Sequence, residues 1–117
     1  MTHGLRALAA ACLAVATSAH ANIEITEWAY SAAEGEFIEF TNLGAAPVDF
    51  ANWVYDDESR LSTAAAGGFD LSGFGVVQAG ESVVLTEGNA SAFRAAWGLG
   101  AGVKVVGGFT NNLGRND

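Results

Sequence analysis

The side chains that could carry chemistry in this sequence are mainly carboxylates and aromatic rings. Asp56, Asp57 and Glu58 are three consecutive acids in a polar stretch, and their oxygens could bind Ca²⁺, which prefers several carboxylates on a flexible loop. They lack the D-x-D-x-D-G spacing of a specific calcium loop, so a solvated run of charge is the better interpretation. We therefore predict no metal site, and these three acids are kept as candidates for calcium alone.

Two glutamate pairs have the composition, but not the spacing, of a glycosidase site. Such a site needs two carboxyl groups that converge on one glycosidic bond. Glu24 and Glu27, and likewise Glu36 and Glu39, are three residues apart, which on a regular strand places them on opposite faces. We therefore predict no catalytic residue among them.

The aromatic side chains allow a second kind of site. Three tryptophans and two tyrosines could stack on sugar rings, but in a small β-sandwich rings of this size are expected as core anchors. We therefore predict that these side chains are packed in the core: Trp28, Tyr30, Trp53, Tyr55 and Trp97.

The first 21 residues have the three-part layout of a secretory signal peptide. One positive charge in residues 1–6 precedes an apolar run at 7–16, and the small-x-small exit AHA occupies 19–21. The run is too short for a transmembrane helix, which needs about 20 residues, and no later segment is longer. We predict cleavage after Ala21, a secreted or cell-envelope location, and no transmembrane segment after cleavage. A lipoprotein signal at Cys12 is disfavoured because three alanines precede it and more apolar residues follow.

Removal of this segment would leave 96 residues with fewer kinds of reactive side chain. His3, Cys12 and His20 would be lost, so the mature chain would hold no imidazole and no thiol. Ser-His-Asp triads, Cys nucleophiles, His or Cys zinc sites, and haem or iron–sulfur ligation would all be excluded. The catalytic options left are carboxylate pairs, Lys104, a tyrosine and a hard metal ion. We predict no cofactor and no enzyme activity.

The mature chain would be strongly acidic, with four basic residues against 13 acidic ones and a formal charge of −9 instead of −8. A surface of this sign repels polyanions, so we predict no direct contact with nucleic acid.

Hydrophobic residues make up 50% of the chain and charged ones 15%, which is typical of a folded domain. Export without a disulfide is ordinary for a bacterial envelope protein, so we expect a bacterial source.

The periodicity along the chain is that of short strands. Alternation at residues 23–26 changes phase toward Trp28 and Tyr30, which predicts a bulge near Glu27. A hairpin at 32–35 leads into the clearest alternating strand. The strands expected after the hairpin are at residues 36–43, 47–50, 53–55, 82–86 and 104–106, with a loop between Asp56 and Gly68.

One short helix is expected near residues 90–97. Asn89 or Ser91 can cap its start, and Gly98 can end it. Phe93 and Trp97 are four residues apart and so share its inner side. Several short strands with one minor helix predict an all-β sandwich or barrel in a single domain.

Four segments carry a family resemblance: IEITE at 23–27, GEFIEFTN at 35–42, PVDFANWVYDD at 47–57 and GESVVL at 80–85. An E-[FYW]-[IV]-E-[LFI]-x-N strand followed by P-V-[DN]-[LF]-x-x-W is an unusual combination, and it resembles the bacterial lamin tail domain. The resemblance spans nearly all of residues 22–117 and implies an immunoglobulin-like β-sandwich. Bacterial members of the family are exported, and they occur alone, repeated, beside secreted nucleases or phosphatases, or ahead of a surface-sorting segment. The resemblance implies no catalytic residue.

Family members continue beyond the position of Asp117 with a strand and usually a hairpin. We therefore expect either that this chain is a C-terminal truncation that lacks the last strands of the domain, or that a strand from elsewhere completes the fold. A 96-residue domain buries only about 60 to 65% of its unfolded surface. Residues 22–117 alone should therefore be marginally stable, and a sharp cooperative melt well above about 60 °C would contradict this expectation.

Two functional hypotheses follow. The first is a non-catalytic, exported, immunoglobulin-like binding or spacer module, displayed at the cell surface, whose partner is an unknown protein or cell-surface ligand. The alternative is an N-terminal accessory domain of a secreted hydrolase of the nuclease or phosphatase type, with the catalytic part downstream. In that role the acidic domain would position the enzyme and would not grip a polyanionic substrate.

Overall fold

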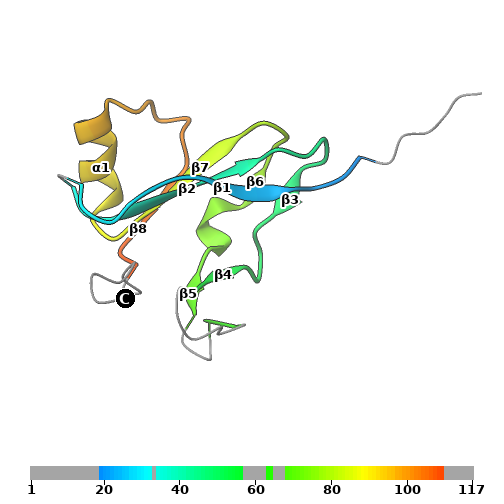
Figure 1. Cartoon of the computed structure of the whole chain (residues 1–117), viewed down its shortest axis with the longest axis horizontal. Helices are drawn as coiled ribbons and strands as arrows, with labels where there is room; N and C mark the ends of the chain where they lie inside the picture. Colours follow the sequence, from blue (N-terminus) through cyan, green and yellow to red (C-terminus); the bar gives the residue numbers. More distant parts are fainter. Residues whose placement is uncertain (1–18, 33, 57–62, 65–67, 110–117) are drawn as a thin grey trace, which may run out of the picture.

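The computed structural model describes residues 19–32, 34–56, 63–64 and 68–109 (Figure 1). Short strands account for most of the regular structure in this part of the chain, as the alternation predicts. In chain order the elements are β1 (Ile23–Ala29), β2 (Phe37–Asn42), β3 (Val48–Asp49), β4 (Val54–Tyr55), β5 (Phe69–Asp70), the 3₁₀ turn η2 (Ser72–Phe74), β6 (Val76–Val77), β7 (Ser82–Thr86), α1 (Ala90–Trp97) and β8 (Val105–Gly107).

The first layer is a four-stranded sheet with the strand order β1-β2-β7-β8. β1 and β2 form the predicted antiparallel hairpin, and β2 pairs with β7 in the same sense. β7 and β8 are parallel because α1 forms the crossover between them, and parallel neighbours require a connection of this kind. This parallel pair has no counterpart in the sequence-based expectations.

The predicted bulge near Glu27 is confirmed. Ile25 lies opposite Phe40, whereas Glu27 lies opposite Glu39, so Thr26 is an extra residue in β1. A bulge lets the bulged strand change which side chains point to each face. Because of the bulge, the β1 side chains on the sheet face that bears Ile38 and Phe40 are Ile23 and Ile25 before Thr26, and Trp28 after it.

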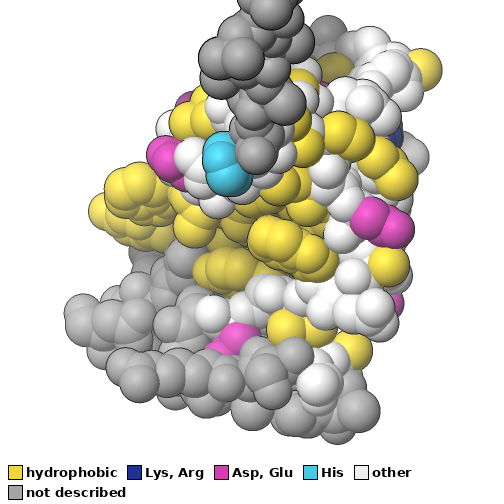
Figure 2. All heavy atoms as spheres, turned by 90° about the vertical axis from the view of Figure 1, so that its right-hand side faces the viewer, with side chains coloured by type: hydrophobic (Ala, Val, Ile, Leu, Met, Phe, Trp, Pro, Cys, Tyr) yellow, Lys and Arg dark blue, Asp and Glu magenta, His cyan; other side chains and the backbone are white. Residues whose placement is uncertain are grey.

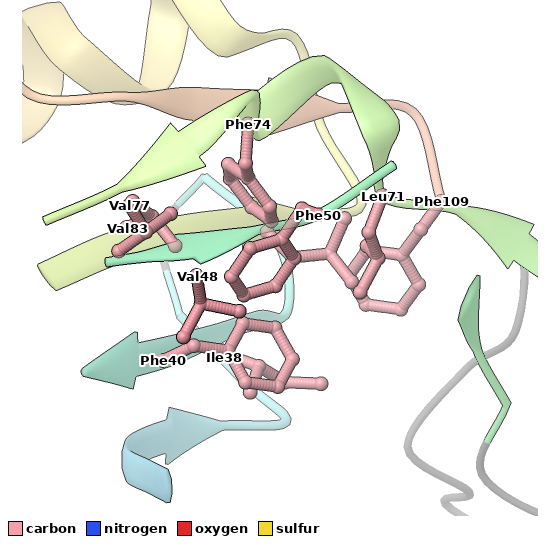
Figure 3. Packing of buried hydrophobic residues seen from close by; sticks show 10 residues of the cluster. Ile38, Phe40, Val48, Phe50, Leu71, Phe74, Val77, Val83 and Phe109 are labelled. Carbon is pink, nitrogen blue, oxygen red and sulfur yellow. The ribbon is translucent and has the colours of Figure 1, made fainter. Parts of the chain in front are cut away.

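The second layer consists of two small antiparallel pairs, β3 with β6 and β4 with β5. A hydrophobic core fills the space between this layer and the four-stranded sheet (Figure 3). The Phe74 ring meets the rings of Phe50 and Phe40 edge-on, with centroids 5.4 and 6.4 Å away. The buried members of this core are Ile38, Phe40, Val48, Phe50, Leu71, Phe74, Val77, Val83, Leu85 and Phe109. The prediction of an all-β, immunoglobulin-like sandwich is confirmed.

The helix α1 covers the opposite face of the four-stranded sheet (Figure 1). It begins at the predicted cap Asn89, whose side-chain oxygen accepts hydrogen bonds from the N–H groups of Ser91 and Ala92. It ends at Gly98, which takes the left-handed conformation with φ of 63°. Phe93 of α1 is buried against Phe37 of β2, Val84 of β7 and neighbouring side chains.

The expectation that the large aromatic residues anchor the core is wrong for most of them. Trp28, Tyr30 and Trp97 are 63%, 60% and 51% exposed, and Trp53 is 42% exposed. Tyr55 packs against the main core, where its ring meets that of Phe109, and the half-exposed Trp53 ring lies 4.8 Å from that of the core residue Phe50. The phenylalanines fill the core instead, since they need no hydrogen-bond partner when buried. Hydrophobic side chains also gather at the surface on the face of the molecule turned toward the viewer in Figure 2.

The chain just before β1 lies against the turn that follows β2. The N–H groups of Ala45 and Leu43 donate to the carbonyl oxygens of His20 and Asn22, at 2.8 and 2.7 Å. A side chain on Gly44 would place its Cβ only 2.0 Å from the His20 carbonyl oxygen, so this approach requires glycine. Residues 1–18 of the predicted signal peptide lie outside the described part of the chain, as does most of the predicted loop at 56–68.

Candidate functional site: a groove between β1 and α1

A groove of about 180 Å³ lies on the helix-covered face of the four-stranded sheet. Its lining combines apolar side chains from the sheet and helix with two carboxylates from the β1–β2 hairpin. The lining residues are Glu27, Phe37, Glu39, Val84, Phe93, Trp97 and Leu99.

Three aromatic rings build one wall of this groove. Phe37 projects from β2, and its ring meets those of Phe93 and Trp97 edge-on, with centroids 5.4 and 5.5 Å away. Phe93 and Trp97 are four residues apart on α1, and their rings stack with centroids 5.8 Å apart. The wall is therefore fixed by mutual packing, while half of the Trp97 surface is open to solvent.

The bulge in β1 brings two carboxylates together at the groove. Because Thr26 is the extra residue, Glu27 lies directly opposite Glu39 on the same face of the sheet. The Thr26 hydroxyl donates to the Glu39 carboxylate at 2.6 Å. Like charges placed opposite each other on neighbouring strands destabilise a sheet by roughly 0.2 to 1 kcal/mol.

The same bulge corrects the argument about glutamates three residues apart. Glu24 lies opposite Thr41 and Glu27 opposite Glu39, and Thr41 and Glu39 share one face of β2. Glu24 and Glu27 therefore point to the same side of the sheet, contrary to the expectation for a regular strand. Glu36 is buried just before β2, and its N–H donates to the Glu87 carboxylate at 3.0 Å. The pair that meets is thus Glu27 with Glu39, which the sequence spacing did not suggest.

The calcium candidates are not assembled into a site by the described residues. Asp57 and Glu58 lie outside the described part of the chain, and Asp56 is half-buried with an interaction partner of its own. In the ranges that the structure describes, no three His, Cys, Asp or Glu side chains are grouped to hold a metal ion.

Lys104, which the sequence left as a catalytic option, makes contacts that hold parts of the fold together. Its ammonium group donates to the Val76 carbonyl and forms an ion pair with Glu81 at 3.4 Å. These contacts join the residue before β8 to β6 and to the turn between β6 and β7. Arg94 similarly donates from its guanidinium group to the Val103 carbonyl and so ties α1 to the segment after it.

A second, larger hollow of about 240 Å³ lies beside β4 and β5. Asp70 lines it and accepts hydrogen bonds from the Ser72 N–H at 2.8 Å and the Ser72 hydroxyl at 2.9 Å. These two bonds, the backbone one first, hold the pKa of the Asp70 carboxyl below its usual value. Because the side chain is exposed and already bonded locally, this arrangement is that of a turn rather than of a reactive acid.

Comparison with family models gives a match over residues 16–115 to the Lamin Tail Domain model. The chain belongs to the lamin tail domain family. The match covers the sandwich and α1, and so agrees with the resemblance read from the strand motifs. Searches of curated proteins and of solved structures find no match.

The structure shows the physical role of Asn42, the asparagine at the end of the first family motif. In this lamin tail domain Asn42 is fully buried, and its amide donates to the Ala46 carbonyl at 2.8 Å and the Val77 carbonyl at 3.2 Å. It also accepts from the Gly44 N–H at 3.0 Å. The motif residue is therefore a link between the two layers.

No described helix of this lamin tail domain has the length and hydrophobicity needed to cross a membrane.

Proposed function

We propose that this lamin tail domain is a non-catalytic binding module that works outside the cytoplasm, displayed at the cell surface, and that the groove between β1 and α1 is its contact surface. The observation that carries this proposal is the half-exposed Trp97 ring, held by Phe37 and Phe93 beside Glu27 and Glu39. Aromatic side chains that are rigidly held yet open to solvent provide large contact area at low entropic cost, and they are enriched at binding surfaces.

The rigidity of the wall favours binding over a purely spacing role. A spacer needs a stable fold but no exposed aromatic side chain, whereas binding gains when the contact residues are ordered in advance. Both elements that bear the rings are anchored: β2 lies inside the sheet, and α1 is capped at each end. The alternative of a hydrolase accessory domain depends on a catalytic part elsewhere, and no described residue bears on it.

Binding can be tested with the fluorescently labelled, secreted protein and intact cells of the source organism. We expect saturable binding that the substitution Trp97→Ala weakens about tenfold or more, a loss of about 1.4 kcal/mol. Trp28→Ala is the matched control, because Trp28 is also more than half exposed but lies on the opposite face of the sheet. Equal binding by wild type and Trp97→Ala would show that the groove is not the surface that contacts the cell, and no binding at all would leave the spacer role.

Export is a separate part of the proposal and has its own test. The wild-type chain, expressed in a bacterium and fractionated, should leave the cytoplasm and begin at Asn22. Leu13→Arg, which interrupts the apolar run, should keep the chain inside with its N-terminus intact. Retention of wild type in the cytoplasm contradicts export, and a lipid-modified chain that begins at Cys12 contradicts the predicted cleavage site.

A further inference from the structure

The two carboxylates in the groove have no cation to balance them within the described part of the chain. Among those residues the ion pair formed is that between Lys104 and Glu81, and Arg94 is bonded to a backbone carbonyl. In the part of the chain that the structure describes, the Glu39 carboxylate accepts a hydrogen bond from the Thr26 hydroxyl, which carries no charge. Within the described residues, the opposed Glu27 and Glu39 therefore lower the stability of the hairpin, and a cation supplied by a partner would offset their repulsion.

The aromatic wall beside these carboxylates suits a cation as well. The face of a tryptophan ring is the most favourable of the aromatic side chains for a cation, through the negative charge of the ring quadrupole. Trp97 lines the same groove as Glu27 and Glu39, and half of its surface is open. A positive group seated there would have the two carboxylates and the Trp97 ring among its neighbours.

The size of the groove limits the occupant to one side chain. Its volume of about 180 Å³ is below the roughly 300 to 1,000 Å³ of pockets that hold small-molecule ligands and cofactors. A single long side chain fits this space, and the apolar residues Val84 and Leu99 suit a hydrocarbon stem.

We propose that the groove binds an arginine side chain presented by a partner protein, with the guanidinium group between Glu27 and Glu39 and its stem along the aromatic wall. Arginine fits better than lysine because its planar group stacks on aromatic faces and forms paired hydrogen bonds to carboxylates. The net charge of −8 attracts a basic segment over longer range. This inference rests on the proposed function, since it names the chemistry of the partner at the same groove.

The test uses the secreted protein, labelled with ¹⁵N, and a short Gly-Ser peptide that holds one central arginine. The indole N–H signals of the three tryptophans give a reporter and two internal controls. We expect the Trp97 signal to shift saturably, with a dissociation constant of about 1 mM or tighter, while Trp28 and Trp53 stay in place. The same peptide with citrulline, the neutral isostere of arginine, should bind about tenfold more weakly, and raised salt should weaken the arginine peptide.

Variants then separate charge from shape. Glu27→Gln with Glu39→Gln should weaken the arginine peptide about tenfold or more, whereas Glu24→Gln should leave it unchanged. Glu24 is the matched control, because it lies on the same strand and face but does not line the groove. Equal binding of the citrulline peptide, an unchanged affinity in the double variant, or shifts at all three indoles would each overturn the proposal.

The two proposals fail separately. If Trp97→Ala abolishes cell binding but no arginine peptide shifts the Trp97 signal, the groove is a contact surface for a partner of other chemistry, and the arginine assignment is wrong. If Trp97→Ala leaves cell binding intact and the peptide still binds in the groove with the expected charge dependence, the arginine site stands, and the proposed role in cell-surface binding is wrong.

Discussion

The side-chain amide of Asn42, at the end of β2, donates to the backbone carbonyl of Val77 in β6 across 3.2 Å and so bonds one layer of the sandwich to the other. Asn42 has no exposed surface, and all its polar side-chain atoms have protein partners. A buried amide of this kind resists substitution because its removal strands several backbone groups away from water.

The first prediction concerns this link. Asn42→Ala should lower the free energy of unfolding by about 3 kcal/mol or more, because two carbonyls and one N–H lose their partner and a cavity is left. Urea denaturation measures the loss. Asn22→Ala is the control, since Asn22 is exposed and bonds only to Glu24 through its side chain, and it should change stability by less than about 0.5 kcal/mol. Equal effects of the two substitutions would show that the amide is not a structural link.

For the opposed glutamates we predict that a substitution raises stability instead of lowering it. Glu27→Gln should raise the free energy of unfolding by roughly 0.2 to 1 kcal/mol, because it removes the repulsion between Glu27 and Glu39 across the hairpin. The gain should shrink at high salt, where the repulsion is screened. Thermal melts at low and high ionic strength check this, and a loss of stability in Glu27→Gln would mean that the two charges are already neutralised within the chain.

Substitutions at the start of α1 test which of the two candidate residues, Asn89 or Ser91, caps the helix. Asn89→Ala should cost about 1 kcal/mol, since its side-chain oxygen accepts from the N–H groups of Ser91 and Ala92. Ser91→Ala should be nearly neutral, because Ser91 lies inside the helix and its hydroxyl makes no capping bond there. Chemical denaturation of the two variants compares them directly. If Ser91→Ala were the more damaging substitution, the helix would begin later than Ala90.

The acidity of Asp70 gives a pH-dependent prediction. Its pKa is lowered first by the backbone N–H of Ser72 and then by the Ser72 hydroxyl. A carboxyl with a depressed folded-state pKa contributes stability above its unfolded-state pKa, and the contribution is lost as the pH falls through the folded-state value. Carboxyl NMR titration should show that Ser72→Ala raises the pKa of Asp70 only in part, because the backbone bond remains. An unchanged pKa in Ser72→Ala would exclude the hydroxyl as a cause.

The contact of His20 with the turn after β2 predicts an effect of cleavage after Ala21. A chain that begins at Asn22 loses the His20 carbonyl, which accepts from the N–H groups of Ala45 and Ala46. Amide exchange of Ala45 should therefore be faster in this chain than in one that begins at Ala19. Leu43 provides the internal control, because its acceptor is the Asn22 carbonyl, which both chains retain. Equal exchange at Ala45 would mean that residues 19–21 do not hold the turn.

Local patterns in the sequence were sufficient for much of the fold. Alternation placed β1 and β2, and the phase change toward Trp28 revealed the bulge, because the side-chain period of a strand is fixed by its backbone. The β-branched residues of 82–86 placed β7. The cap at Asn89 and the stop at Gly98 bounded α1, since both act through bonds within a few residues. The strand motifs also led to the family, and the family model agrees over residues 16–115.

Tertiary structure decided the features that depend on partners distant in the chain. The parallel pairing of β7 with β8 and the meeting of Glu27 with Glu39 follow from crossover and register, which no local pattern specifies. Exposure of Trp28 and Trp97 depends on what the second layer and the helix leave uncovered, and aromatic content alone predicted the reverse. Sequence thus determined most of the segments that become strands and the one helix, because backbone preference is local, but it did not predict β5 and β6, which are two residues long. The groove exists only where β1, β2 and α1 are brought together by long-range packing.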